Sequence, residues 1–478
     1  MVSFFFYNTD KESVTSAGGG IMKKYIFPLL AFALLSTQSW GQTKPTEAQT
    51  ELNAYMDDGL VTFKSQDGQY SFRVGGRLAV DGAYYIDDYT DRSSGADLSS
   101  ARIRIFSKLG SKLDVKFDID FASGVSIKDA YLRWHTDRAG FLRVGHFAEP
   151  FSAENIASTF DYNFINKSAT NEAFAPGRAL GVSYRHYSNY LWGEGGIFSQ
   201  KIGKSHSNGD MGWGVTARLL ARYTGEDWAV HAGGAFSYRI PDANGFANGN
   251  DDYNRSVILA SSLESAIDKT NMLYSKVNNV KQTFKYNIEG LATWRNLYLT
   301  GEYTHGKYVR ERDWDYNFQT SLGTLMGTFT PTPEIYKSFF GPDTNAEFSG
   351  YQVQAGWLIR GGNYRYNKVD ALMNRPGRNS LELIARYNHT DLNYIEPGSI
   401  FMNGKFYSNE MMASWGMANT SVVGGVANTF TVGVNYYFTH NIAMKVNYSY
   451  AHLDQQYSDA FRYDKNLHTL QMRLQLEF

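Results

Sequence analysis

Cysteine is absent from the 478-residue chain. Its absence excludes a disulfide framework, a thiol nucleophile and a thiolate metal site, and with them several enzyme classes and all cysteine-based zinc modules. Charge of one sign is not in excess either, because the formal net charge is -1 at pH 7. A nucleic-acid binder needs a clustered surplus of lysine and arginine, so the composition argues against that class of protein.

Apolar character is also low overall, since the mean hydropathy of -0.40 is too polar for a bundle of membrane-spanning helices. Aromatic residues and glycine are abundant, with 34 Tyr, 31 Phe and 45 Gly. The wall of a membrane β-barrel reconciles these two facts. Each strand shows lipid only every second side chain, while aromatic girdles raise the content of Tyr and Phe.

An export signal is predicted over residues 22–41. Two lysines precede an apolar run over 25–35, and small residues stand at positions 39 and 41. This pattern is typical of a secretory signal peptide, with cleavage expected before Gln42. The alternative, a membrane anchor, is disfavoured because the apolar run is about half the length of a spanning helix.

The rest of the chain divides into three parts. Residues 1–21 precede Met22, a better candidate for the start of translation, and are interpreted as an extension that was assigned to the protein in error. Residues 42–68 are expected to form an N-terminal periplasmic segment, and residues 69–478 a single barrel domain.

Strict alternation marks the strands of that barrel. From residue 470 to Phe478 every second residue is apolar and every other one is polar. A period of two predicts a strand, and two faces this extreme suit a wall between lipid and water. Ending on Phe478 also resembles the terminal signature of outer-membrane barrels. The same template predicts an all-β fold, a transmembrane antiparallel β-barrel of about 16 strands: 69–81, 99–109, 112–121, 125–136, 139–147, 178–187, 190–200, 211–224, 226–238, 283–294, 296–307, 348–360, 380–389, 426–438, 441–452 and 465–478.

The connections provide a second test, because such a barrel alternates long surface loops with short periplasmic turns. The even connections are short, and the longest connections are odd: 82–98, 148–177, 239–282, 308–347 and 390–425. The exception is 361–379, a longer even connection, which leaves open a miscount of the strands.

The polar face of the strands predicts a water-filled lumen with many fixed cations. Acidic residues share that face on the third strand, where Asp114, Asp118 and Asp120 surround Lys116. The charged residues therefore form either a track for anions or a wall whose charges neutralise one another. On a charged surface that faces water, the second arrangement is the commoner one. The candidate pore-lining cations are Arg73, Arg77, Arg102, Arg104, Lys108, Arg143, Arg218 and Arg222.

Connection 148–177 is unlike a loop in water, because it carries several apolar residues that need burial. Folding into the barrel would bury them, narrow the pore and place Lys167 and Arg178 at the constriction. Packing on top of the barrel or at a subunit contact would bury them equally well. The apolar residues are Phe151, Ile156, Phe160, Phe164, Ile165 and Phe174.

A family resemblance supports the barrel. Five stretches carry it: Val74–Arg77, Ala101–Arg104, Asp129–Leu132, Val144–Phe151 and Phe174–Gly181. In this order and spacing they resemble the phosphate-selective porin O and P family, firmly over residues 59–187 and diffusely afterwards. The resemblance implies a sixteen-stranded homotrimeric barrel in which the third surface loop folds into the lumen. It also implies that arginines and lysines pass anions inward.

Two positions depart from the family pattern. Ser99 and Ser100 stand where relatives often carry paired arginines, and Asn166-Lys167 replaces a common Glu-Arg pair. Lysine keeps the charge but lacks the planar fork that grips two phosphate oxygens, so selectivity for phosphate is left open.

The sequence thus predicts a porin in the outer membrane of a Gram-negative bacterium, passing small solutes, in particular anions such as phosphate, without a cofactor or metal. Two alternatives remain, a general non-selective porin and a barrel-anchored surface-binding protein. An enzyme is disfavoured, because the 10 His are scattered and no Gly-x-Ser-x-Gly or His-Glu-x-x-His spacing occurs.

Overall fold

The computed structural model describes residues 52–57, 60–87, 92–136, 139–199, 211–243, 255–277, 280–310, 345–394, 401–402, 405–406, 422–454 and 466–478. The predicted extension 1–21 and signal peptide 22–41 lie outside the described residues.

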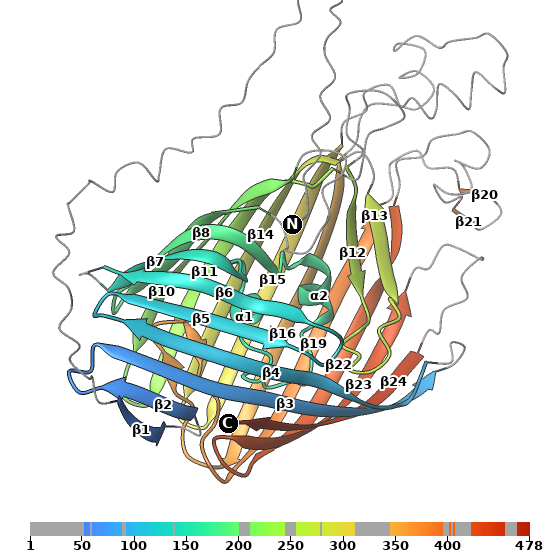
Figure 1. Cartoon of the computed structure of the whole chain (residues 1–478). Coiled ribbons are helices and arrows are strands. Elements are labelled where there is room, and N and C mark those ends of the chain that lie inside the picture. The colour runs from blue at the N-terminus through green and yellow to red at the C-terminus, as the bar shows by residue number, and fades with distance from the viewer. Residues whose placement is uncertain are drawn as a thin grey trace, which may run out of the picture. The chain divides into compact units, whose positions relative to one another are not determined.

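Sixteen antiparallel strands form a closed barrel (Figure 1), and each of them was predicted from the sequence. Every strand pairs with the next along the chain, and the last, β24, pairs back with the first, β3. Closure leaves no unpaired strand edge in the wall, as a membrane-spanning sheet requires. The strands are β3 (Tyr70–Asp87), β4 (Gly95–Leu109), β5 (Leu113–Asp120), β6 (Ser126–His135), β7 (Gly140–Ala148), β8 (Arg178–Tyr187), β9 (Leu191–Phe198), β10 (Trp213–Thr224), β11 (Trp228–Ile240), β14 (Val280–Trp294), β15 (Leu297–Arg310), β16 (Ala346–Arg360), β19 (Ser380–Tyr394), β22 (Val422–Tyr437), β23 (Ile442–Asp454) and β24 (Asn466–Glu477).

The two faces of the wall differ as the alternation predicts. Along β10, Val215 and Leu219 are exposed on the outer face, whereas Thr216 and Arg218 between them are buried on the inner face. The outer face therefore presents apolar side chains to lipid, and the inner face presents polar ones to the lumen. Among the described residues, no helix is long and apolar enough to cross a membrane.

The barrel closes at a seam between Gly76 and the C-terminal residue. The amide of Phe478 donates to the carbonyl oxygen of Gly76 at 3.0 Å, and the Phe478 ring lies where a side chain at position 76 would stand. Beyond the seam, β2 (Leu60–Ser65) pairs with β3 and forms a hairpin with β1 (Leu52–Asp57). The segment predicted as an N-terminal periplasmic extension thus contains two strands that the sequence analysis did not predict.

Four connections carry secondary structure of their own. The first, 148–177, contains α1 (Ala153–Ile156) and α2 (Ala169–Phe174). The connection after β11 contains the hairpin of β12 (Val257–Ser261) and β13 (Leu273–Val277), and 361–379 contains β17 (Tyr366–Asn367) and β18 (Leu372–Met373). A last pair of short strands is β20 (Phe401–Met402) with β21 (Lys405–Phe406).

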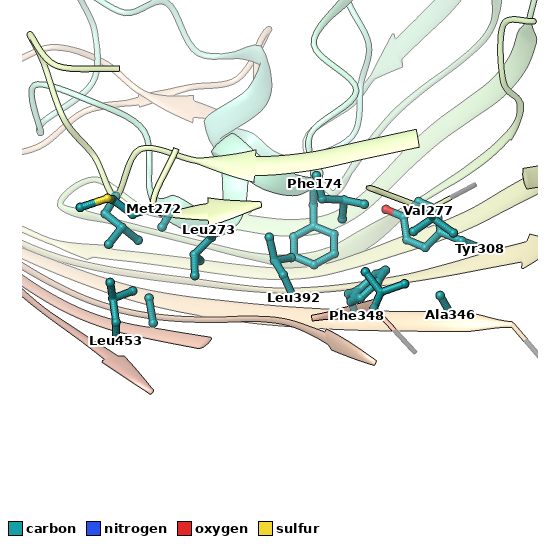
Figure 2. Packing of buried hydrophobic residues seen from close by; sticks show 14 of the residues in the cluster. Phe174, Met272, Leu273, Val277, Tyr308, Ala346, Phe348, Leu392 and Leu453 are labelled. Atoms are coloured by element: carbon teal, nitrogen blue, oxygen red, sulfur yellow. The ribbon is translucent and has the colours of Figure 1, made fainter. Parts of the chain in front are cut away.

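An apolar cluster fixes the first two of these connections to the barrel wall (Figure 2). Phe174 of α2 and Leu273 and Val277 of β13 belong to this cluster, together with Phe348 of β16 and Leu392 of β19. Each of these side chains is at most 3% exposed. Apolar packing of this kind stabilises two infolded segments inside a lumen that is otherwise polar.

Candidate functional site

Charged side chains line the inner surface of β3 to β8 and the adjoining end of β24, and we call this surface the basic face. Its cations outnumber its carboxylates, and most of them form ion pairs across neighbouring strands. The cations are Arg77, Arg102, Arg104, Lys116, Lys128, Arg133 and Arg178. The carboxylates are Asp114, Asp118, Asp120, Asp129 and Glu477.

The pairing expected between the second and third strands is present. Nε of Arg102 lies 3.0 Å from an Oδ atom of Asp120, and Nε of Arg104 lies 3.8 Å from Asp118. Arg104 also pairs with Glu477, which accepts a hydrogen bond of 2.9 Å from Arg77. Part of the predicted cationic lining is therefore neutralised within the wall.

A second group of pairs lies around Asp129. Its two oxygens contact Nζ of Lys116 at 2.6 Å and Nε of Arg178 at 2.9 Å. A β-bulge at Lys128 places one extra residue between the partners of Asp118 and Ile119, and Nζ of Lys128 lies 3.8 Å from Asp120. The bulge changes the parity of the strand, so a residue that strict alternation assigns to lipid contacts the inner face.

Four cations of the basic face are more exposed than the carboxylates with which they pair. The side chains of Lys116, Lys128 and Arg178 are 19%, 30% and 31% exposed, against at most 10% for Asp120 and Asp129, and Arg133 is 28% exposed against 22% for Asp114. The other three cations, Arg77, Arg102 and Arg104, are at most 10% exposed.

Connection 148–177 lies across the interior of the barrel (Figure 1), where its backbone carbonyls accept hydrogen bonds from the opposite wall. Side chains of β19, β22, β23 and β24 reach five of these carbonyls, so the buried backbone of the loop is satisfied by the wall. The pairs are Gln475 with Phe160, Lys445 with Tyr162, Asn435 with Asn163, Arg473 with Ile165 and Arg386 with Asn166.

Arg386 of β19 joins two infolded segments. Its guanidinium pairs with Glu154 of connection 148–177 at 3.4 Å and with Glu264 of the connection between β12 and β13. The same group lies 4.2 Å from the ring centre of Phe164. Arg386 is 2% exposed, so its contacts are structural and it is remote from water.

Lys167 is half-buried at the surface of the infolded connection. Its Nζ donates to Oδ1 of Asn155 at 3.5 Å and lies within electrostatic range of Glu154 and Arg178. Burial lowers the pKa of Lys167 to about 8, and the carboxylate of Glu154 opposes that shift. In the same connection, burial raises the pKa of Glu172 to about 7, against a hydrogen bond from Ser261.

The other predicted pore-lining cations are distributed more widely. Arg143 pairs with Glu194, and Arg218 pairs with Glu289, where both side chains are at most 1% exposed. Arg222 is buried and donates to the carbonyl oxygen of Ser188 at 3.1 Å. Lys108 is exposed and Arg73 is half-buried, both toward the end of the barrel with short turns.

Connection 361–379 covers part of the lumen at this turn end. Trp192 of β9 donates through Nε1 to the carbonyl oxygen of Val369 at 2.8 Å, and Arg185 of β8 pairs with Asp370 at 2.6 Å. From its other end, Arg375 pairs with Glu477 of β24 at 3.3 Å. The connection thus reaches from β8 and β9 to β24, and no additional wall strand is hidden in it.

The sequence analysis did not select Lys128 and Arg133 as site residues. Arg133 lies on the inward, polar face of its strand, two residues after Tyr131 on the same face. The alternation of the strand could therefore have identified it. Lys128 falls out of phase with Arg133, and the only sign of its bulge in the sequence is the pair of consecutive polar residues Lys128 and Asp129 after Ile127. No group of three His, Asp or Glu side chains placed to hold a metal ion occurs in the described part of the chain.

A closed barrel with an apolar exterior and a charged, water-accessible interior defines a membrane channel. The chain belongs to the phosphate-selective porin O and P family, whose sequence model matches residues 72–478. It is therefore an outer-membrane channel for passive diffusion, a class distinct from enzymes. No relative was found among curated protein sequences.

Several solved structures are similar in fold. OmpT of Vibrio cholerae lacking loop L8 is 11% identical over 86% of this chain and 100% of that chain, with a TM-score of 0.49. An anion-selective porin from Comamonas acidovorans is 12% identical over 86% and 100%, with a TM-score of 0.46. The channel DcaP of Acinetobacter baumannii is 14% identical over 87% and 99%, with a TM-score of 0.44. Similarity at this level does not identify the solute.

Proposed function

We propose that small anions, phosphate among them, cross the pore along the basic face. The difference in exposure carries this proposal, because the side chains of Lys116, Lys128, Arg133 and Arg178 are each more exposed than the carboxylate with which they pair. An anion in the lumen meets positive charge first, and a narrow passage with low-dielectric walls strengthens that attraction.

The proposed path lies beside β4 to β8. On the opposite side, the infolded connection and the wall are in direct contact, and Arg386, Lys445 and Glu382 are at most 2% exposed. On the basic face, Lys128, Arg133 and Arg178 are 28–31% exposed, so the proposed path lies beside them. Lys167 lies within electrostatic range of Arg178, so the loop adds a cation opposite the wall.

Neutralising the two most accessible cations is expected to reduce the preference for anions. In Lys128→Gln/Arg178→Gln the anion-to-cation permeability ratio should fall about tenfold, because the attraction of the passage is lost while its recessed acids remain. Reversal potentials across a potassium chloride gradient measure the ratio. The control is Arg295→Gln/Lys307→Gln, which removes two exposed cations outside the lumen. A cation-selective wild type, or an unchanged ratio in the lumen variant, would contradict the proposal.

Raising the pH from 6 to 9 is expected to weaken the anion preference. Glu172 becomes negative as the pH passes its pKa of about 7, and Lys167 becomes neutral as the pH passes about 8. The first change adds a negative charge and the second removes a positive one, so both lower the net charge of the infolded connection. Lys167→Gln should lack the part of the change centred near pH 8. A preference that increases with pH would refute this expectation.

The alternatives predict different conductances. A general non-selective porin gives ohmic channels with a reversal potential near zero and no response to millimolar phosphate. A surface-binding protein anchored by a plugged barrel gives no channels.

Export with cleavage before Gln42 and assembly as a homotrimer complete the proposal. N-terminal sequencing tests the cleavage site, and the mass of the purified assembly tests the oligomeric state.

A further inference from the structure

A shallow apolar groove of about 680 Å³ lies on the outer face of the wall, across β11, β14, β15, β16 and β19. The strand register arranges its lining in rows. The row next to the periplasmic turns consists of Trp228, Trp294, Leu297, Trp357 and Leu383. The next row, one step toward the middle of the barrel, consists of Val230, Ala292, Leu299, Ala355 and Ala385.

Side-chain size explains why the wall is hollowed here. Ala292, Ala355 and Ala385 form a low floor beside three outward-facing, exposed tryptophans. The volume is within the range of sites that bind small ligands, about 300–1,000 Å³. The described residues that line the groove include no charged side chain. Its occupant must therefore be apolar over most of its length.

We propose that this groove binds an acyl chain of a phospholipid from the periplasmic leaflet, with Arg295 at the phosphate. The groove is continuous with the lipid-facing wall, so hydrocarbon is what surrounds it. A concave surface contacts one chain on several sides, whereas the convex wall elsewhere touches lipid on one side only, and dispersion attraction grows with contacts.

The end of the groove matches a headgroup in charge. Arg295 occupies the turn between β14 and β15, with a side chain 61% exposed and its guanidinium 5.7 Å from the ring centre of Trp294. Its Nε is 3.5 Å from an oxygen of Asp227, and the exposed remainder of the guanidinium is accessible to an anion. Tryptophan and arginine side by side are typical of the headgroup level of a membrane.

A second copy of this chain fits the groove less well. The wall of a second barrel is rigid and convex, so it does not follow the hollow floor between the tryptophans. A flexible chain can follow the floor of the groove between the tryptophans. The phospholipid is therefore the occupant that the shape and the charge together favour.

Filling the floor tests the proposal. In Ala292→Leu/Ala355→Leu, isobutyl groups occupy the space of the acyl chain. The matched control is Ala217→Leu/Ala221→Leu, which changes two exposed alanines of β10 that lie outside the groove. Full chains are purified into nanodiscs of phosphatidylethanolamine and phosphatidylglycerol and analysed by native mass spectrometry. Phospholipid retention should fall about tenfold in the filled variant and stay unchanged in the control, with equal conductance in both.

Arg295→Asn tests the headgroup contact separately, because Asn suits the left-handed backbone at this position, where φ is 52°. This variant should retain phospholipid but lose its preference for phosphatidylglycerol over phosphatidylethanolamine. Equal retention by the filled variant and its control would overturn the proposal. A loss of retention accompanied by a change in oligomeric state would also overturn it, because the groove would then be an interface between copies of the chain.

Discussion

Replacing Arg386 with methionine is expected to release two infolded segments and to raise the single-channel conductance about twofold or more, because conductance follows the open cross-section of the lumen. Arg386 forms ion pairs with both connection 148–177 and the connection between β12 and β13, which also hydrogen-bond to each other through Ser261 and Glu172. Methionine keeps much of the length and the apolar contact with Phe164 but removes the charge.

The expected effect is large because the arginine compensates two buried carboxylates. Without it, Glu154 and Glu264 remain in a region where their side chains are 8% and 2% exposed. Breaking a buried ion pair by removing one partner costs about 3–5 kcal/mol. The segments can avoid that cost by moving toward water, and their movement widens the pore.

Neutralising the carboxylates provides the control. In Arg386→Met/Glu154→Gln/Glu264→Gln the uncompensated charges are gone, so the low conductance should return in large part. Limited proteolysis between residues 148 and 177 should follow the same order, fast in Arg386→Met and slow in the triple variant and the wild type. If Arg386→Met conducts and resists protease like the wild type, Arg386 does not hold the segments in place.

The wall could be predicted from the sequence, because its cause is local. A period of two decides which side chains face lipid, and all sixteen barrel strands follow from it. The ends were less exact, since β3 continues to Asp87 and β19 to Tyr394, beyond the predicted ends at 81 and 389. Connection length also separated the two ends of the barrel. The exception, 361–379, is long because it covers part of the lumen and not because a wall strand was missed.

The contents of the lumen could not be predicted in the same way. Gln475 contacts Phe160 across 315 positions of sequence, and Arg386 contacts Asn166 across 220. Alternation places both side chains on the inner face but does not say which loop covers them. As a result, the sequence analysis assigned both Arg218 and Arg178 to the pore lining. In the structure the first is buried against Glu289 and the second is 31% exposed.

Shortening connection 361–379 is expected to enlarge the periplasmic mouth. Replacing residues 361–379 with Asn-Gly would join β16 to β19 by a tight hairpin turn, the usual connection at this end of a barrel. The change removes the segment that extends from Trp192 and Arg185 to Glu477. The single-channel conductance should rise about twofold or more, because the covered part of the lumen opens to water.

The same change should weaken the preference for anions. The deleted segment carries Arg365, Lys368, Arg375 and Arg378 but a single carboxylate, Asp370. Its removal uncovers Arg222 and Arg185, yet it takes three net positive charges from the periplasmic mouth and leaves Glu477 without Arg375. Conductance and reversal potential are measured on the same channels, which separates the wider opening from the altered charge.

A point variant provides a second test that does not depend on correct folding of the shortened chain. Asp370→Asn/Arg375→Gln keeps the length of the connection but removes its ion pairs with Arg185 and Glu477, so the conductance should rise in the same direction by a smaller amount. Thermal unfolding monitored by circular dichroism shows whether each barrel is folded. A folded, shortened barrel with wild-type conductance would mean that the infolded connection 148–177 alone limits the flow, because the two constrictions act in series.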